Sequence, residues 1–398
     1  MFSSMMGRYS LILGTLAACL LAYSCEKEHG SAGSDTGDAL VSVRFASARA
    51  VTRASDLEQT EGETRVNTLD VLVYRADGTG ALDVHHEATQ SEIDSHVIEM
   101  KSPVGLKSIY LVANATAGAR AAFASEETLS SYILSLSDNS RQSFVMIGTP
   151  GQNVSLRSGA GNDFSIQMRR IAARVSVRSI VAEFTSPAQR AADFRIKRII
   201  LGYVDRTAPL CFGDVVDPFG QKVGKDDLDG RKEGYYYWPY PESDEGFVNP
   251  AVLSDGRLVV TGDKQEHNLT VHSFEGAEGL LYAPDTDNLP HRWDGRVLLY
   301  MYPNSSPALS GENDRTTKLI IETEWNGITY WYPFSIPDVQ PNTAYTFSSI
   351  TLCRLGNLDP DEPLDVTQAM FELEVVDWEN GSILGSYNGR GGYVINGQ

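Results

Sequence analysis

Short runs rich in Val, Ile, Tyr and Phe recur along most of the chain, and clusters of Gly, Asn, Asp and Pro separate them. Such runs are typical of β-strands, and such clusters are typical of the turns between antiparallel strands. The Asp-Gly pair of ADGTG (76–80) and the Asn-Gly pair of WNGIT (325–329) predict hairpins, because these pairs adopt a positive φ at low cost. One segment, SEETLSSYILSL (125–136), is predicted to be helical, with Ser125 as its N-cap. The sequence therefore predicts an all-β protein of one or two β-sandwiches with few short helices.

The composition limits the classes of partner that the chain can have. Its 398 residues suffice for two or three domains, and a hydrophobic fraction of 42% argues against a disordered protein. The 33 basic and 52 acidic residues give a formal net charge of −19, which repels phosphate backbones and excludes nucleic acid as a partner. Only Cys211 and Cys353 follow residue 25, and two distant cysteines do not make a disulfide framework.

The N-terminus has the pattern of a bacterial export signal. Arg8 precedes the apolar run YSLILGTLAACLLAY (9–23), which is too short to span a bilayer comfortably, and a polar segment follows. An apolar run that ends in a Cys after small residues resembles a lipoprotein signal, in which the Cys carries the acyl chains. Cys25 is the preferred lipidation site because the polar tether begins there. Cys19 is the alternative, since LAAC fits the usual motif better letter by letter.

The stretch ALVSVRFASARAVTRASD (39–56) joins a strand to two protease-sensitive bonds. Val41, Val43 and Phe45 alternate, so they lie on one face of the predicted strand. Two Arg-Ala pairs, Arg49-Ala50 and Arg53-Ala54, follow in a small, polar segment. Exposed arginines have no special meaning in an arbitrary protein, and that interpretation stays open from these residues alone.

The sequence contains no recognisable catalytic constellation. It has no Gly-x-Ser-x-Gly elbow, phosphate-binding loop or Cys-x-x-Cys pair. His267 and His272 are five residues apart, which places them on opposite faces of a strand and makes them a poor metal pair. We therefore expect no enzymatic activity, no cofactor and no metal site.

Two aromatic runs, YYYWPYP (235–241) and WNGITYWYPF (325–334), permit two interpretations. Their rings could form a platform that stacks on sugars. In the second run, however, Tyr330, Tyr332 and Phe334 alternate with Trp331, as in a strand that fills a sandwich core with aromatic side chains. Core packing is the favoured interpretation.

Several segments in the same order resemble the fimbrillins of the Bacteroidales, the major-fimbrium subunits of the type V pilus. In the first half the resemblance rests on VLVYRADG (71–78), SIYLVANA (108–115) and MRRIAARVSVRSI (168–180). In the second half it rests on LYMYPN, RTTKLIIETEWNG, YTFSSITLCRLGNLDPDEP and FELEVVDW. The resemblance covers nearly the whole exported chain and is weakest over residues 207–249.

The resemblance implies two tandem transthyretin-like Greek-key β-sandwiches and a maturation pathway. The expected organisation is a signal peptide at 1–25, a tether with a removable first strand at 26–53, two sandwiches at 54–182 and 183–380, and a tail at 381–398. An arginine-specific extracellular protease would cut after Arg53, before Ala54, with Arg49-Ala50 as the alternative bond. The strand bearing Val41, Val43 and Phe45 would then leave, and a strand from an identical or related subunit would take its place. The lipid would bind the precursor to the outer membrane before it joins the extracellular fimbria.

The tail GSILGSYNGRGGYVINGQ (381–398) is the expected donor of that strand. Its candidate donor side chains fall in two pieces joined by a Gly-rich link: Ile383, Leu384, Tyr387, Tyr393 and Ile395. Without the resemblance, the tail reads as a frayed terminus. A removable strand together with a tail favours a stalk subunit. The alternatives are a tip or anchor adhesin of the same pilus, and a monomeric glycan-binding surface lipoprotein.

Overall fold

The computed structural model describes fifteen stretches of the chain: residues 37–47, 61–151, 153–159, 161–202, 204–205, 207–211, 235–236, 250–252, 258–260, 269–283, 291–303, 316–336, 339–360, 362–378 and 382–397. All of them belong to one compact unit, Thr36–Gln398. Among these residues, no helix combines the length and the apolar character that crossing a membrane requires.

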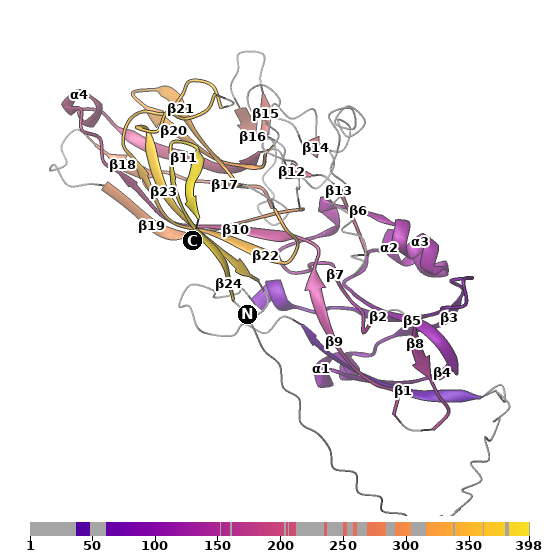
Figure 1. The fold of residues 1–398 in the computed structure, drawn as a ribbon. Helices are drawn as coiled ribbons and strands as arrows, with labels where there is room; N and C mark the ends of the chain where they lie inside the picture. Colours follow the sequence, from indigo (N-terminus) through magenta and orange to yellow (C-terminus); the bar gives the residue numbers. More distant parts are fainter. Residues whose placement is uncertain are drawn as a thin grey trace, which may run out of the picture. The chain divides into compact units, whose positions relative to one another are not determined.

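The first half of the described chain is built on one eight-stranded sheet (Figure 1). Its order is β3-β2-β5-β7-β9-β1-β4, and β8 also pairs with β5. The strands are β1 (Asp38–Ser47), β2 (Leu69–Arg75), β3 (Leu82–Glu87), β4 (Val97–Pro103), β5 (Gly105–Ala113), β7 (Met146–Gly148), β8 (Val154–Leu156) and β9 (Asp163–Arg170). The helical segments are η1 (Glu61–Thr64), α1 (Gln90–Ser95), α2 (Ala117–Ala121), η2 (Ala122–Ala124), α3 (Glu126–Ser131) and η3 (Leu136–Asp138).

The two faces of this sheet bury different cores because the side chains of a strand alternate. Val71 and Val73 of β2 face a core that also contains the apolar residues of β1. Leu72 and Tyr74 face the other way, toward the segment of α2, η2 and α3 that supplies Phe123. The strand β2 is therefore buried on both faces, which explains why its run LDVLVY is apolar except for Asp70.

The second half consists mainly of two further sheets. A six-stranded sheet has the order β19-β10-β22-β23-β24-β25, and a five-stranded sheet has the order β17-β11-β20-β21 with β18 also on β11. The strands of the six-stranded sheet are β10 (Ala173–Ala182), β19 (His291–Met301), β22 (Thr343–Leu352), β23 (Ala369–Asp377), β24 (Ile383–Arg390) and β25 (Tyr393–Gly397). Those of the five-stranded sheet are β11 (Phe194–Gly202), β17 (Val271–Ser273), β18 (Leu280–Tyr282), β20 (Lys318–Trp325) and β21 (Ile328–Ser335).

Aromatic side chains from both sheets fill the core of this second sandwich. Phe334 of β21 contacts Phe347 of β22 and Phe371 of β23, with ring centroids 6.3 Å and 5.4 Å away. The remaining elements are α4 (Pro187–Arg190) and the short pairs β6 (Ile133–Ser135) with β13 (Thr207–Pro209), β12 (Val204–Asp205) with β14 (Tyr235–Tyr236), and β15 (Pro250–Val252) with β16 (Leu258–Val260).

The local sequence signals agree with these elements. Asn326 and Gly327 take φ values of 50° and 78° in the β20–β21 hairpin, as their positive-φ preference predicts. Ser125 caps α3 by accepting a hydrogen bond from the Thr128 amide. The helix ends at Ser131, earlier than predicted, because Ile133 already pairs with β13. The predicted all-β sandwich fold with few short helices is confirmed.

The change from the first sheet to the second comes earlier than the expected boundary at residues 182–183. β9 ends at Arg170 in the first sheet, whereas β10 starts at Ala173 and pairs with β19 and β22 of the second. The small, polar stretch after residue 182 contains the four-residue helix α4 and leads from β10 to β11, so both its neighbours lie in the second half. Its composition therefore marks a connection within the second half, and the sheets change at two buried residues, Ile171 and Ala172.

Candidate functional site

The strand β1 lies inside its sheet and not at an edge. It pairs in parallel with β9, Val43 opposite Phe164, and antiparallel with β4, Val43 opposite Ile98 (Figure 1). The Ser42 amide donates to the Asn162 carbonyl at 3.0 Å. Because both edges of β1 are paired, its removal would leave two strands, β4 and β9, without a partner between them.

The side chains of β1 explain why it takes this position. Val41, Val43 and Phe45 are buried, as predicted, and Ala39 extends the same face by one more buried residue. Leu40 points away and is 59% exposed. Burial of the three predicted side chains contributes about 5–9 kcal/mol at about 1.5–3 kcal/mol each. The strand is therefore held by its side chains as well as by its ladders.

The chain leaves β1 through residues 48–60, which lie outside the described residues. That segment contains both candidate bonds, Arg49-Ala50 and Arg53-Ala54. The candidate lipidation sites Cys19 and Cys25 also lie outside the described residues. Since β1 is the first described strand, a cut anywhere in 48–60 would separate it covalently from every other described element.

A buried charge cluster fixes the first turn after this segment. The Glu63 carboxylate is fully buried and accepts hydrogen bonds from Arg174 Nη1 at 2.8 Å and from the Tyr300 hydroxyl at 2.6 Å. Arg170 Nε donates to the Glu63 carbonyl at 2.8 Å, and both guanidinium groups lie over the Trp378 ring. Burial, together with the Glu63 carboxylate, raises the pKa of Tyr300 well above its usual value.

Sequence reasoning did not find this cluster. Its members come from η1, β9, β10 and β19, and from the residue that follows β23, so no local pattern joins them. The signal that was available is a pair of arginines, Arg170 and Arg174, beside strands of otherwise apolar character. The cluster ties η1, which leads into the first sheet, to strands of the second sheet.

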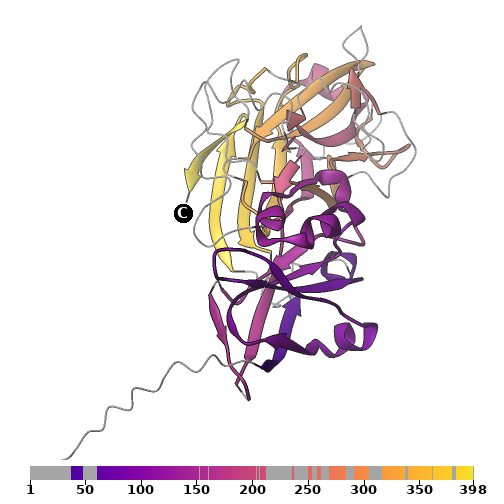
Figure 2. The same ribbon diagram turned by 90° about the vertical axis from the view of Figure 1, so that its right-hand side faces the viewer.

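The predicted donor residues lie in the two strands at one edge of the second sandwich. β24 pairs antiparallel with β23 of its own chain, and β25 pairs with β24. Figure 2 shows these last strands, in yellow, at the margin of the sheet. Ile383 and Leu384 are 67% and 58% exposed, and Tyr387 is half-buried. Tyr393 and Ile395 belong to β25, and their side chains lie outside the described features.

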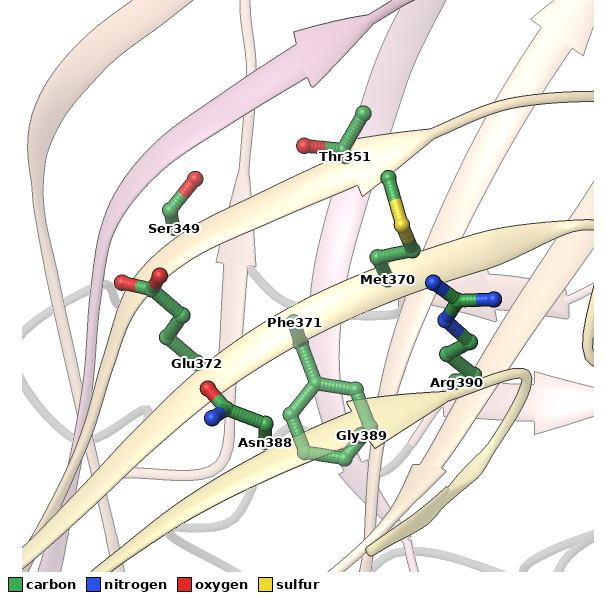
Figure 3. A pocket seen from close by; sticks show the side chains of 8 residues that line it. All are labelled: Ser349, Thr351, Met370, Phe371, Glu372, Asn388, Gly389 and Arg390. Carbon is green, nitrogen blue, oxygen red and sulfur yellow. The ribbon is translucent and has the colours of Figure 1, made fainter. Parts of the chain in front are cut away.

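The buried positions of β24 are occupied by glycine. Gly385 and Gly389 are buried, whereas the large apolar residues Ile383 and Leu384 face solvent. Figure 3 shows the Phe371 side chain reaching alongside Gly389, where it fills the space that a larger residue would need. Residues of β22, β23 and β24 line an open groove of about 350 Å³, and the same view shows their side chains. Asn388 and Arg390 of the tail line it, so the groove depends on the tail strand being in place.

The aromatic run 325–334 is part of the core. Trp331, Tyr332 and Phe334 are buried, and the Tyr332 hydroxyl donates to the Arg354 carbonyl at 2.7 Å. These three rings are therefore not available to stack on a sugar, and the favoured prediction of core packing holds for this run. Of the run 235–241, only the backbone of Tyr235–Tyr236 is described.

One cluster of possible metal ligands was not anticipated from the sequence. Oxygen and nitrogen atoms of Asp70, His85 and Glu87 lie within 4.8 Å of one another. Asp70, however, already pairs with His85 Nε2 at 2.9 Å and with Arg120 at 3.1 Å. The arginine compensates the charge of the buried carboxylate, so the cluster is explained as an ion-pair network.

Comparison with known proteins supports the resemblance found in the sequence. Residues 39–163 match the family described as major fimbrial subunit protein (FimA), a span that begins in β1 and ends at the start of β9. No curated protein matches the chain in sequence. The resemblance to the fimbrillins is thereby confirmed, and the family match covers the chain from β1 to the start of β9.

Several solved structures share the fold, including two candidate cell adhesion proteins and a fimbrilin. A candidate cell adhesion protein of Bacteroides eggerthii is 16% identical with a TM-score of 0.55, covering 86% of this chain and 96% of that chain. One of Parabacteroides distasonis is 16% identical with a TM-score of 0.53, covering 86% and 97%. A fimbrilin (FimA) of Porphyromonas gingivalis is 14% identical with a TM-score of 0.52, covering 86% and 98%. At these identities the likeness concerns the fold, and it extends over 86% of this chain.

Proposed function

We propose that this chain is a structural subunit of a cell-surface fimbria and has no enzymatic activity. The match of residues 39–163 to the major fimbrial subunit family and the fold shared with a fimbrilin support the proposal. The described clusters of polar residues are accounted for by ion pairs and structural hydrogen bonds. Its partners are other fimbrial subunits, identical or related, and its site of action is outside the cell.

The subunit polymerises by exchange of β1 for a strand of another subunit. The observation that carries this proposal is the place of β1: it is the first described strand, yet it sits between β4 and β9 with a fully apolar inner face. While it is present, the edges of β4 and β9 are covered and cannot pair with other chains. Once it is removed, a donated strand can form the same two ladders by β-augmentation.

Proteolysis makes the exchange possible without itself ejecting the strand. A cut after Arg53, or after Arg49, removes the covalent tether and with it the high effective concentration that favours rebinding of β1. The side-chain burial of β1 still holds the nicked strand, so a competing strand has to enter stepwise. In the precursor, the lipid on Cys25, or on Cys19, attaches the same N-terminal segment to the outer membrane. Cleavage therefore also frees the subunit from its anchor.

The donor is the C-terminal tail, which makes the chain a stalk subunit. To act in another subunit, β24 and β25 have to leave β23 of their own sheet. The glycines at the buried positions 385 and 389 favour this release, because little side-chain burial is lost. A tip subunit of the same fimbria is the alternative, and in that case the tail stays in its own sheet.

Limited trypsin digestion of the chain from residue 26 onward tests the proposal. We expect a new N-terminus at Ala54 or Ala50, followed over days by ladders or filaments in size-exclusion chromatography and electron microscopy. The double variant Arg49→Ala, Arg53→Ala is the control and stays monomeric. A variant that ends at Gly381 is expected to be cleaved without forming filaments.

A clean cut that leaves a stable monomer under all conditions contradicts the stalk assignment. Capping of filaments of a related stalk subunit by that monomer would then identify a tip subunit. A monomer that neither polymerises nor caps would leave the monomeric surface lipoprotein as the remaining interpretation.

A further inference from the structure

The turn between β24 and β25 touches both sheets of the second sandwich through backbone atoms. We propose that Gly389, Gly391 and Gly392 form a glycine latch that holds the C-terminal strands closed against their own domain and thereby regulates when they become available. This inference rests on the proposed function, because the closed strands are the proposed donor. In this inference the three glycines keep the C-terminal strands paired within their own domain until strand exchange takes place.

The first contact of the latch lies inside the sandwich. A Cβ atom added to Gly389 would clash with the Phe371 ring. Phe371 is buried and packs on Phe334 and Phe347, with ring centroids 5.4 Å and 5.5 Å away. Moving the ring would disturb this packing on Phe334 and Phe347, so glycine at position 389 lets β24 close over it without that cost.

The second contact lies at the turn. A Cβ atom on Gly391 would lie 2.6 Å from the Leu364 carbonyl oxygen, and one on Gly392 would lie 2.5 Å from the Pro333 carbonyl oxygen. Both obstacles are backbone atoms, which cannot rotate away as a side chain can. Gly391 also has a φ of 60°, a conformation that other residues adopt at a cost.

Hydrogen bonds place the turn between two strands that belong to different sheets. The Gly391 amide donates to the Ala369 carbonyl of β23 at 2.8 Å. The Ser335 amide, on the outer edge of β21, donates to the Gly392 carbonyl at 2.9 Å. The closed turn therefore covers part of the free edge of β21 as well as holding the tail.

The latch is specific in shape and weak in side-chain burial. Glycine offers close backbone approach but almost no apolar surface, so the closed state depends on fit at three points. A misfit at any of them is expected to open the strands without unfolding the sandwich. This combination suits a strand that pairs within its own subunit before assembly and within another subunit afterwards.

Hydrogen exchange on the uncut chain from residue 26 onward tests the latch by itself. Gly389→Ala, Gly391→Ala and Gly392→Ala are each expected to speed amide exchange in β24 and β25 at least tenfold, with exchange in β5 and β20 unchanged. Gly385→Ala is the matched control, because the atoms nearest to its Cβ would belong to the Tyr387 side chain, which is half-buried and can move. Ser386→Ala, on the exposed face of the same strand, is expected to change nothing.

Unchanged exchange in all three latch variants would overturn the inference. Loss of protection in β20 as well as in the tail, in all three variants, would also overturn it, since the glycines would then support the whole sandwich. Gly389→Ala also disturbs the Phe371 ring in the core. Gly391→Ala and Gly392→Ala control for this disturbance, because their added Cβ atoms would meet backbone atoms at the turn.

A cysteine pair across the tail separates the latch from the proposed polymerisation. Glu372 and Asn388 are opposite in register and exposed, so Glu372→Cys with Asn388→Cys is expected to lock β24 when oxidised. After cleavage, the latch variants should form filaments faster and the oxidised pair should not, with reductant restoring assembly. Faster tail exchange without any filaments would support the latch and contradict the proposed function. Filaments from the oxidised pair would contradict release of the tail.

Discussion

The first strand and the C-terminal strands are held in their sheets in opposite ways. β1 lies between two partners and buries Ala39, Val41, Val43 and Phe45. β24 lies near the edge, buries glycines and exposes Ile383 and Leu384. β1 is thus held by apolar side chains, whereas the tail is held by backbone hydrogen bonds and close glycine contacts.

In the proposed assembly, this difference means that the two strands would leave their sheets under different conditions. A strand with about 5–9 kcal/mol of side-chain burial does not leave while a tether keeps its effective concentration high. A strand without that burial can open while its chain stays intact. We infer that β1 needs a protease and that the tail needs only a competing site.

The largest expected effect concerns the apolar anchor of β1. Phe45→Ala should lower the free energy of unfolding of the uncut protein by about 3–5 kcal/mol, because it leaves a cavity beside the His96 ring. Leu40→Ala, on the exposed face of the same strand, is the control and should change it by less than about 0.5 kcal/mol. Urea unfolding measures both.

The same substitution distinguishes the precursor from the polymerised state. After cleavage and exchange, Phe45→Ala should have no effect on filament stability, since β1 is no longer present. A filament destabilised by Phe45→Ala would show that β1 stays bound, and the proposed exchange would be wrong.

The next effect tests where the removable segment ends. Glu63→Gln should lower the free energy of unfolding by about 3 kcal/mol, because it leaves the buried Arg174 guanidinium without its carboxylate partner. The loss should be the same in uncut and cleaved protein, since η1 stays anchored after a cut in 48–60. A loss confined to the uncut protein would mean that η1 leaves together with β1.

A smaller effect on stability is expected from the exposed tail side chains. Ile383→Ser with Leu384→Ser should change the free energy of unfolding of the monomer by less than about 0.5 kcal/mol, because both side chains face solvent. If they are donor side chains, the same double variant should slow filament growth after cleavage. Filament growth at the unaltered rate would indicate that β25, and not β24, supplies the donor side chains.

The smallest expected effect is a pH dependence at Asp365, which lies next to Gly391. The hydrogen bonds that Asp365 accepts from the Thr367 amide and hydroxyl hold the pKa of this carboxyl below its usual value of 3.8. A carboxyl group whose pKa is lower in the folded state stabilises the fold at pH values above its unfolded-state pKa. This stabilisation is lost as the pH falls through the folded-state pKa. The protection of the tail amides relative to their intrinsic exchange rates should therefore be constant from pH 5 to 8 and fall only below about pH 4.

Asp365→Ala serves as the control for this pH dependence. It should remove the acid response of the tail while leaving exchange in β5 unaffected. An acid response that persists in Asp365→Ala would place the titrating group elsewhere in the second sandwich.

Much of the fold follows from local signals in the sequence. The alternation of Val41, Val43 and Phe45 predicts both the strand and its buried face, and the Asn326-Gly327 pair predicts the hairpin. The sheet boundary could not be predicted in this way. β10 looks like the last strand of the first domain because a polar stretch follows it, but pairing partners more than 100 residues away place it in the second sheet.

The sequence by itself determined most of the long strands, where the two Arg-Ala bonds lie and that the chain is acidic, because these depend on residues close together in the chain. Only the tertiary structure decided that β1 is flanked on both edges, that Glu63 joins η1 to the second sheet and that the tail closes on its own domain. The reason is physical: register, sheet order and close backbone contact are set by residues that are distant in sequence. In the sequence, glycine at position 389 indicates a flexible link. In the fold, the same glycine leaves room for the Phe371 ring.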